Sequence, residues 1–150
     1  MLRRRLPPRL VRSWFVGVGL VVASFLAGCA TVKSTRKVVD LAPFKHIFVV
    51  HRLVDDHHVD QLIVAELKRL GHDASAGPLT MMPDKADAVL TYEDRWEWDF
   101  KTYLIEFNFE IFTARTKKKL ADGRYYAPSP KSRPPAAIIH DALAPLYATK

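Results

Sequence analysis

The residues of this sequence that are best suited to chemistry are histidines and aspartates between positions 51 and 73: His51, Asp55, Asp56, His57, His58, Asp60, His72 and Asp73. Imidazole and carboxylate groups are common ligands of zinc, nickel or copper. Neighbouring residues on a helix point about 100° apart, so His57 and His58 need ligands from another element to hold one ion. His51 and His72 lie on expected strands, which could supply those ligands.

The same residues also suit the solvated start of a helix, because aspartates are favoured at the positive end of the helix dipole. We take this as the primary interpretation and expect neither a metal nor another cofactor. His51, His57, His58 and His72 stay as the candidate ligands of an alternative, a metal-binding protein or metal-dependent enzyme.

Motifs of known enzyme classes are missing from the sequence. It has no G-x-S-x-G, H-E-x-x-H or Walker motif, and its only closely spaced glycines, Gly17 and Gly19, lie in the apolar N-terminal segment. We therefore expect no enzymatic activity and assign no catalytic residue.

The N-terminus has the pattern of a secretion signal. Five arginines precede residues 14–26, which carry no charge. A helix of that length spans about 20 Å, less than the ~30 Å hydrocarbon core of a bilayer. A basic leader followed by a short apolar stretch is typical of a signal peptide. The alternative is a plain membrane anchor.

The single cysteine, Cys29, closes this segment in the order Leu26-Ala27-Gly28-Cys29. This order resembles the lipobox of bacterial lipoproteins. The resemblance implies that the thiol of Cys29 is acylated and that residues 1–28 are removed as the signal peptide. By the sorting pattern of such lipoproteins, Ala30 implies the outer membrane, with the protein on its periplasmic side. Acyl chains of this kind hold a protein on a membrane almost permanently.

Composition and charge describe what remains after the signal. The chain has 150 residues, of which 49% are hydrophobic and 26% charged, so one globular domain is expected. The net charge of +7 comes largely from the five arginines of the signal, since the other residues carry 18 basic and 16 acidic side chains. We therefore expect no nucleic-acid partner. Residues 29–43 are interpreted as the lipidated cysteine and a tether, with a short edge strand at 38–41 as the alternative, and residues 44–150 as the domain.

A basic segment and an aromatic row are the candidate interaction sites. Residues 115–133 contain seven basic side chains and one acidic one, with Lys117, Lys118 and Lys119 in succession. They suit an anionic lipid or an acidic envelope partner, or else form a solvated turn. Trp96 and Trp98 belong to an aromatic row with Tyr92, Phe100 and Tyr103. Such a row packs under a helix, unless its strand extends beyond the helices and exposes both tryptophans.

The elements that must position these residues follow from periodicity. We expect strands at 44–51, 72–76, 86–101, 103–111 and 120–127, with a bulge near Asp94 and Arg95 in the longest one. We expect one helix from Asp55 or Asp56 to Gly71, and another from Pro134 to about Pro145. The order β-α-β-β-β-β-α predicts an α+β two-layer sandwich, with a mixed, mostly antiparallel sheet and two helices on one face.

Short motifs in this domain resemble a group of uncharacterised bacterial outer-membrane lipoproteins. They are Ala65-Glu66-Leu67 with Gly71, Ala86-Asp87 with Leu90 and Tyr92, and Thr113-Ala114-Arg115-Thr116 with Leu120, Ala121 and Gly123. Lys117 stands where that group often has a turn glycine. The architecture is also similar to the N-terminal domain of the Tol translocation protein and to the lipopolysaccharide-transport lipoprotein. The resemblance implies a non-catalytic binding or assembly accessory of the cell envelope.

Overall fold

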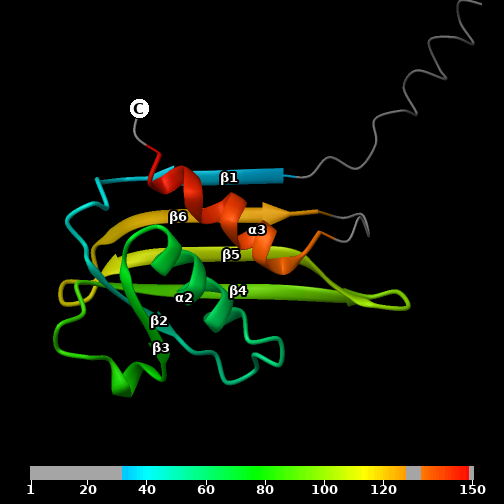
Figure 1. The fold of residues 1–150 in the computed structure, drawn as a ribbon, viewed down its shortest axis with the longest axis horizontal. Helices are drawn as coiled ribbons and strands as arrows, with labels where there is room; N and C mark the ends of the chain where they lie inside the picture. The colour runs from blue at the N-terminus through cyan, green and yellow to red at the C-terminus, as the bar shows by residue number, and fades with distance from the viewer. Residues whose placement is uncertain (1–31, 128–132, 149–150) are drawn as a thin grey trace, which may run out of the picture. The chain divides into compact units, whose positions relative to one another are not determined.

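The computed structural model describes residues 32–127 and 133–148, which form one six-stranded sheet covered on one face by two helices (Figure 1). The expectations for the signal segment and Cys29 lie outside these residues. The strands are β1 (Val32–Lys37), β2 (His46–Val50), β3 (Asp73–Gly77), β4 (Ala88–Trp98), β5 (Thr102–Thr113) and β6 (Lys119–Tyr126); the helices are α2 (Val59–Arg69) and α3 (Pro135–Leu143), with 3₁₀ turns η1 (Leu79–Met81) and η2 (Ala144–Leu146).

The sheet is mixed and mostly antiparallel, as predicted. Its strand order is β1-β6-β5-β4-β2-β3. β2 runs parallel to β3 and β4, and the remaining pairs are antiparallel. The predicted bulge is confirmed, because the register of β4 against β5 shifts between Arg95 and Trp96.

Strand β1 differs from the expectation. Residues 30–43 were expected to be a tether, with an edge strand at 38–41 as the alternative, but the strand lies earlier, at Val32–Lys37, and pairs with β6. Its sequence is polar and lacks an apolar row. An edge strand needs backbone partners on one side only, and charged side chains protect its other side. Arg36 pairs with Asp122 at 2.7 Å, and Thr35 Oγ1 donates to Ala142 O at 3.2 Å.

The helices end where their glycine and proline residues predict. Gly71 has a φ of 92°, and α3 gives way to a 3₁₀ turn at Pro145. Helix α2 begins at Val59, later than predicted, because His58 has a left-handed φ of 53°. The helical hydrogen-bond pattern cannot extend back through a left-handed residue.

The main core lies between the helices and the sheet. Leu90, Phe107 and Ile111 of the sheet are buried against residues of α2 and α3 such as Ile63 and Leu143. A smaller cluster around Phe48 and Val89 lies apart from it. Within the described residues, none of the helices has the length and apolarity needed to cross a bilayer.

Candidate functional site

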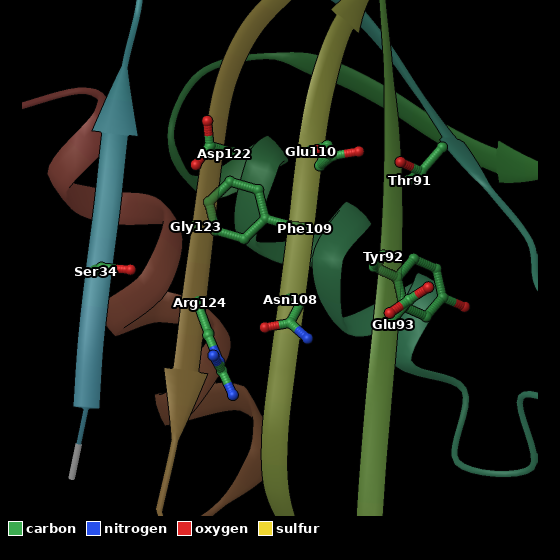
Figure 2. A pocket seen from close by; sticks show the side chains of 10 residues that line it. All are labelled: Ser34, Thr91, Tyr92, Glu93, Asn108, Phe109, Glu110, Asp122, Gly123 and Arg124. Carbon is green, nitrogen blue, oxygen red and sulfur yellow. The ribbon is translucent and has the colours of Figure 1, made fainter.

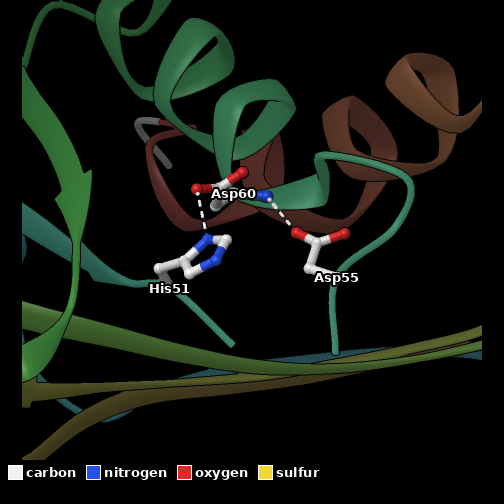
Figure 3. Close-up of side chains that lie close together, drawn as sticks. All are labelled: His51, Asp55 and Asp60. Carbon is white, nitrogen blue, oxygen red and sulfur yellow. Dashed lines mark hydrogen bonds and ion pairs between the residues drawn. The ribbon is translucent and has the colours of Figure 1, made fainter. Parts of the chain in front are cut away.

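The structure brings only one of the four candidate histidines into a cluster with acids. His51 follows β2, Asp55 lies in the next loop, and Asp60 lies in the first turn of α2 (Figure 3). Their candidate ligand atoms lie within 4.8 Å of one another. This group is the candidate metal site that the described residues offer.

The carboxylate of Asp55 is already fully used. It accepts backbone N–H groups of His57 at 3.2 Å, Val59 at 3.1 Å and Asp60 at 3.1 Å. It also accepts the buried Tyr92 hydroxyl at 2.6 Å. Burial raises the pKa of Asp55, whereas these four hydrogen bonds lower it. The hydrogen bonds have the larger combined effect, so the pKa of Asp55 lies below its usual value. Asp55 therefore caps the start of α2 and fastens it to β4.

Asp60 and His51 form the other half of this cluster. His51 Nδ1 lies 2.9 Å from Asp60 Oδ2, and the Gln61 backbone N–H donates to Asp60 Oδ1 at 2.7 Å. A cation would have to displace these donors to reach the carboxylates. The arrangement is better suited to holding the loop 51–58 in place than to binding an ion.

The other candidate histidines lie elsewhere. The ring of His57 packs on Trp96 with centroids 3.8 Å apart. His72 is buried, bonds Phe44 O at 2.9 Å through Nδ1 and packs against Tyr147. The predicted convergence of His51, His57, His58 and His72 is therefore not formed. His72 lies just before β3 and not on the expected strand, and α2 separates it from the loop 51–58.

The aromatic row divides where β4 leaves the helices. Tyr92 is buried and Trp96 is half-buried against the core. Trp98 and Phe100 are 71% and 94% exposed, with ring centroids 6.2 Å apart, at the turn between β4 and β5. In Figure 1 this hairpin extends past α2 and α3. We call the turn at 98–101 the aromatic tip.

The basic segment forms the turn between β5 and β6, which we call the basic turn (residues 114–118). Lys117 has a φ of 55°, so it takes the left-handed conformation that a glycine would supply. Lys117 and Lys118 are exposed, whereas Lys119 is half-buried and pairs with Glu110. Antiparallel strands alternate direction, so this turn and the aromatic tip emerge from opposite ends of β5 (Figure 1).

The uncovered face of the sheet holds a shallow polar pocket of about 380 Å³ (Figure 2). Arg124, which lines the pocket, pairs with Glu106 at 3.0 Å. Asn108 Oδ1 is buried there without a hydrogen-bond partner among the described residues. No motif in the sequence points to this face. The alternation of Glu106, Asn108 and Glu110 along β5 is the signal that could have found it.

Gly123 shapes the centre of the sheet. A Cβ atom at this position would lie 2.4 Å from Phe109 Cε1. Phe109 pairs with Gly123 across β5 and β6, so its ring lies over the glycine. The pocket, the aromatic tip and the basic turn are thus joined by one closely packed sheet.

Comparisons with known proteins show a similar fold, but they do not assign the chain to a family. No family model matches the chain, and no curated protein matches it either. The fold is similar to that of PelC from Paraburkholderia phytofirmans, which was crystallised as a dodecamer: the identity is 16%, the TM-score 0.61, and the match covers 81% of this chain and 100% of PelC. A single-substitution variant of that PelC dodecamer matches with a TM-score of 0.62 at 16% identity, covering 80% of this chain and 100% of the variant. A minor lipoprotein from Acinetobacter baumannii has 16% identity and covers 69% of this chain and 88% of its own, but its TM-score of 0.35 supports no argument.

Proposed function

We propose that this protein is a lipid-anchored, non-catalytic accessory of the bacterial cell envelope that acts by assembly. The observation that carries the proposal is the sequence Leu26-Ala27-Gly28-Cys29, which ends three residues before the sheet begins at Val32. The acyl chains on Cys29 hold the domain on the periplasmic side of the outer membrane. The contacts of His51, Asp55 and Asp60 agree with a binding role, because the Asp55 carboxylate caps the start of α2 and His51 pairs with Asp60.

Self-association is the form of assembly that the fold similarity favours. PelC has the same fold and was crystallised as a dodecamer. The exposed apolar side chains of the described domain, Trp98 and Phe100 above all, are also typical of surfaces that contact other molecules.

The basic turn is the candidate contact for an acidic envelope partner. Within the described residues, Arg115, Lys117 and Lys118 form no ion pair, so their charges are open to a partner. We assign this turn to a protein and not to anionic lipid, because it lies at the end of β5 opposite to the start of β1.

Labelled fatty acid tests the anchor. The wild-type protein, expressed in a bacterial host, should incorporate the label, and Cys29→Ser should not. Ala30→Asp is the matched control, because it should keep the label but shift the protein to the inner membrane. Labelling of Cys29→Ser would refute the site.

Light scattering tests self-association, and it should give a multiple of the protomer mass for the detergent-solubilised protein. A monomer at all concentrations, with no partner captured by crosslinking in cells, would contradict the assembly role.

A further inference from the structure

The aromatic tip lies at the end of the sheet where the chain arrives from Cys29. Val32 pairs with Tyr126, Tyr126 with Glu106, and Glu106 with Arg95. One row of paired residues therefore crosses the sheet from the first residue of β1 to Arg95. Trp98 is three residues beyond Arg95 on β4, so it lies about 10 Å past that row.

The length of chain between Cys29 and β1 sets how far the lipid can be from the sheet. Two residues, Ala30 and Thr31, separate Cys29 from Val32, and the three Cα–Cα steps between Cys29 and Val32 span at most about 11 Å. β1 and β4 are three strand spacings apart, which is about 14 Å. A bilayer that holds an acyl chain on Cys29 is therefore within reach of the aromatic tip as well.

The chemistry of the aromatic tip suits a bilayer surface. Trp98 and Phe100 are exposed next to each other, and their rings are large and apolar. Aromatic side chains are enriched at the level of lipid headgroups. Phe100 also has a φ of 57°, a conformation that is unfavourable for a bulky residue. The acids Glu97 and Asp99 flank the rings, so attraction to anionic lipid does not explain the site.

The loop 51–58 adds apolar surface beside the same part of β4. Arg52 pairs with Asp94, and His57 packs on Trp96. Between these two contacts Leu53 and Val54 are 99% and 75% exposed. Two segments thus present uncovered apolar side chains at the end of the sheet where β1 begins.

We propose that the aromatic tip is a second membrane contact, in which Trp98 and Phe100 insert into the headgroup region of a phospholipid bilayer. This inference rests on the proposed lipid anchor at Cys29. The anchor and the aromatic tip together fix the orientation of the sheet, with its strands rising from the bilayer. The basic turn is then held on the far side, since Thr113 lies seven residues, or about 24 Å, beyond Glu106 along β5.

Tryptophan emission from the full-length lipoprotein in vesicles tests this contact. Trp14 is removed with the signal peptide, so Trp96→Phe leaves Trp98 as the only tryptophan of the mature protein. The matched control moves the reporter to the other end of the sheet, with Lys118→Trp and Trp98→Phe in the same background. Phosphatidylcholine vesicles with and without bromine on the acyl chains near the headgroups are compared. Circular dichroism verifies that each variant folds.

We expect brominated vesicles to lower Trp98 emission about twofold and to leave the reporter at position 118 unchanged. If the protein floats with the vesicles but Trp98 is quenched only by aqueous iodide, the anchor stands and the membrane contact is overturned. If neither bromine nor iodide quenches Trp98, the tip is buried against protein, which also overturns it. If the protein takes up no fatty acid and does not float, the proposed function fails and this inference fails with it.

Discussion

The two hairpin turns of the central strands have similar backbones and opposite chemistry. The aromatic tip holds Phe100 at a φ of 57°, and the basic turn holds Lys117 at a φ of 55°. Both are positions where glycine is the least strained residue. One turn carries two exposed aromatic rings, whereas the other carries exposed lysines.

This difference teaches that the two ends of the sheet present different chemistry to a partner. The apolar turn lies at the end that the chain enters from Cys29, and the charged turn lies at the opposite end. In the sequence both turns were candidate interaction sites, and nothing in the spacing separated them. The pairing of β1 with β6 separates them, because it fixes the end of the sheet at which β1 begins, and hence the end nearest in the chain to the proposed anchor.

The largest change in the free energy of unfolding is expected in the loop 51–58, beside the aromatic tip. Asp55→Ala removes a carboxylate that caps α2 and leaves the buried Tyr92 hydroxyl without its acceptor. The loss of a cap and of a buried hydrogen bond should lower the free energy of unfolding by about 3 kcal/mol. Urea denaturation of the detergent-solubilised protein measures it. Asp56→Ala is the matched control, because Asp56 is exposed and should change stability by less than about 0.5 kcal/mol.

The same protein tests the metal alternative. If His51, Asp55 and Asp60 serve only as a cap and its support, zinc or nickel should leave the unfolding midpoint of the wild type unchanged. A metal site would instead raise the midpoint as the ion concentration rises. Such a rise, absent from Asp55→Ala, would make this loop a ligand site and not the support of an apolar surface.

A substitution in the middle of the sheet tests whether its two ends unfold as one cooperative unit. Gly123→Ala places a Cβ atom 2.4 Å from Phe109 Cε1, in the middle of the sheet. Overpacking of this kind should cost about 1–3 kcal/mol. Gly77→Ala is the control, since its Cβ would meet Phe48 Cζ at an ordinary 3.5 Å. Tryptophan emission, which reports on the aromatic tip, and circular dichroism should shift together; separate transitions would show that the two ends unfold independently.

The sequence predicted the elements that repeat a clear pattern. The alternation from Ala86 to Lys101 predicted β4, which spans Ala88–Trp98, and the break at Asp94 predicted its bulge. It could not predict β1, because Val32–Lys37 is polar and short, and its pairing with β6 joins residues almost ninety positions apart.

The candidate site was harder to predict than the fold. The histidines near position 57 drew attention by their type, but Asp55 organises the loop through backbone N–H groups, which no spacing reveals. The sequence predicted that Trp98 would be exposed only if its strand extended past the helices. Helix length and packing decide that condition, and the structure meets it for Trp98, while Trp96 stays half-buried.

A smaller effect concerns pH and tests whether histidine matters outside the loop. Burial lowers the pKa of His72 below 6.5, the bond to Phe44 O opposes this, and Lys45 adds to it. As pH falls below 6.5 the unfolded chain binds a proton that the folded protein excludes, so stability should fall until the folded pKa is reached. His72→Asn should reduce this slope between pH 7.5 and 5. His58→Asn, at an exposed position, should keep it; an equal loss of slope would assign the effect to the loop beside the tip.

The smallest effects come from the two turns themselves and bear directly on their difference. Phe100→Gly and Lys117→Gly each relieve a left-handed side chain, so each should stabilise the protein by about 0.5 kcal/mol after the entropy of the unfolded chain is counted. Thermal unfolding should therefore treat the two variants alike. The two variants should differ in membrane contact. In the variant with Trp98 as its only tryptophan, Phe100→Gly should weaken quenching by brominated lipid, and Lys117→Gly should leave this quenching unchanged. Equal quenching in both would mean that Phe100 adds nothing to the contact, and that its strained conformation serves only to close the turn.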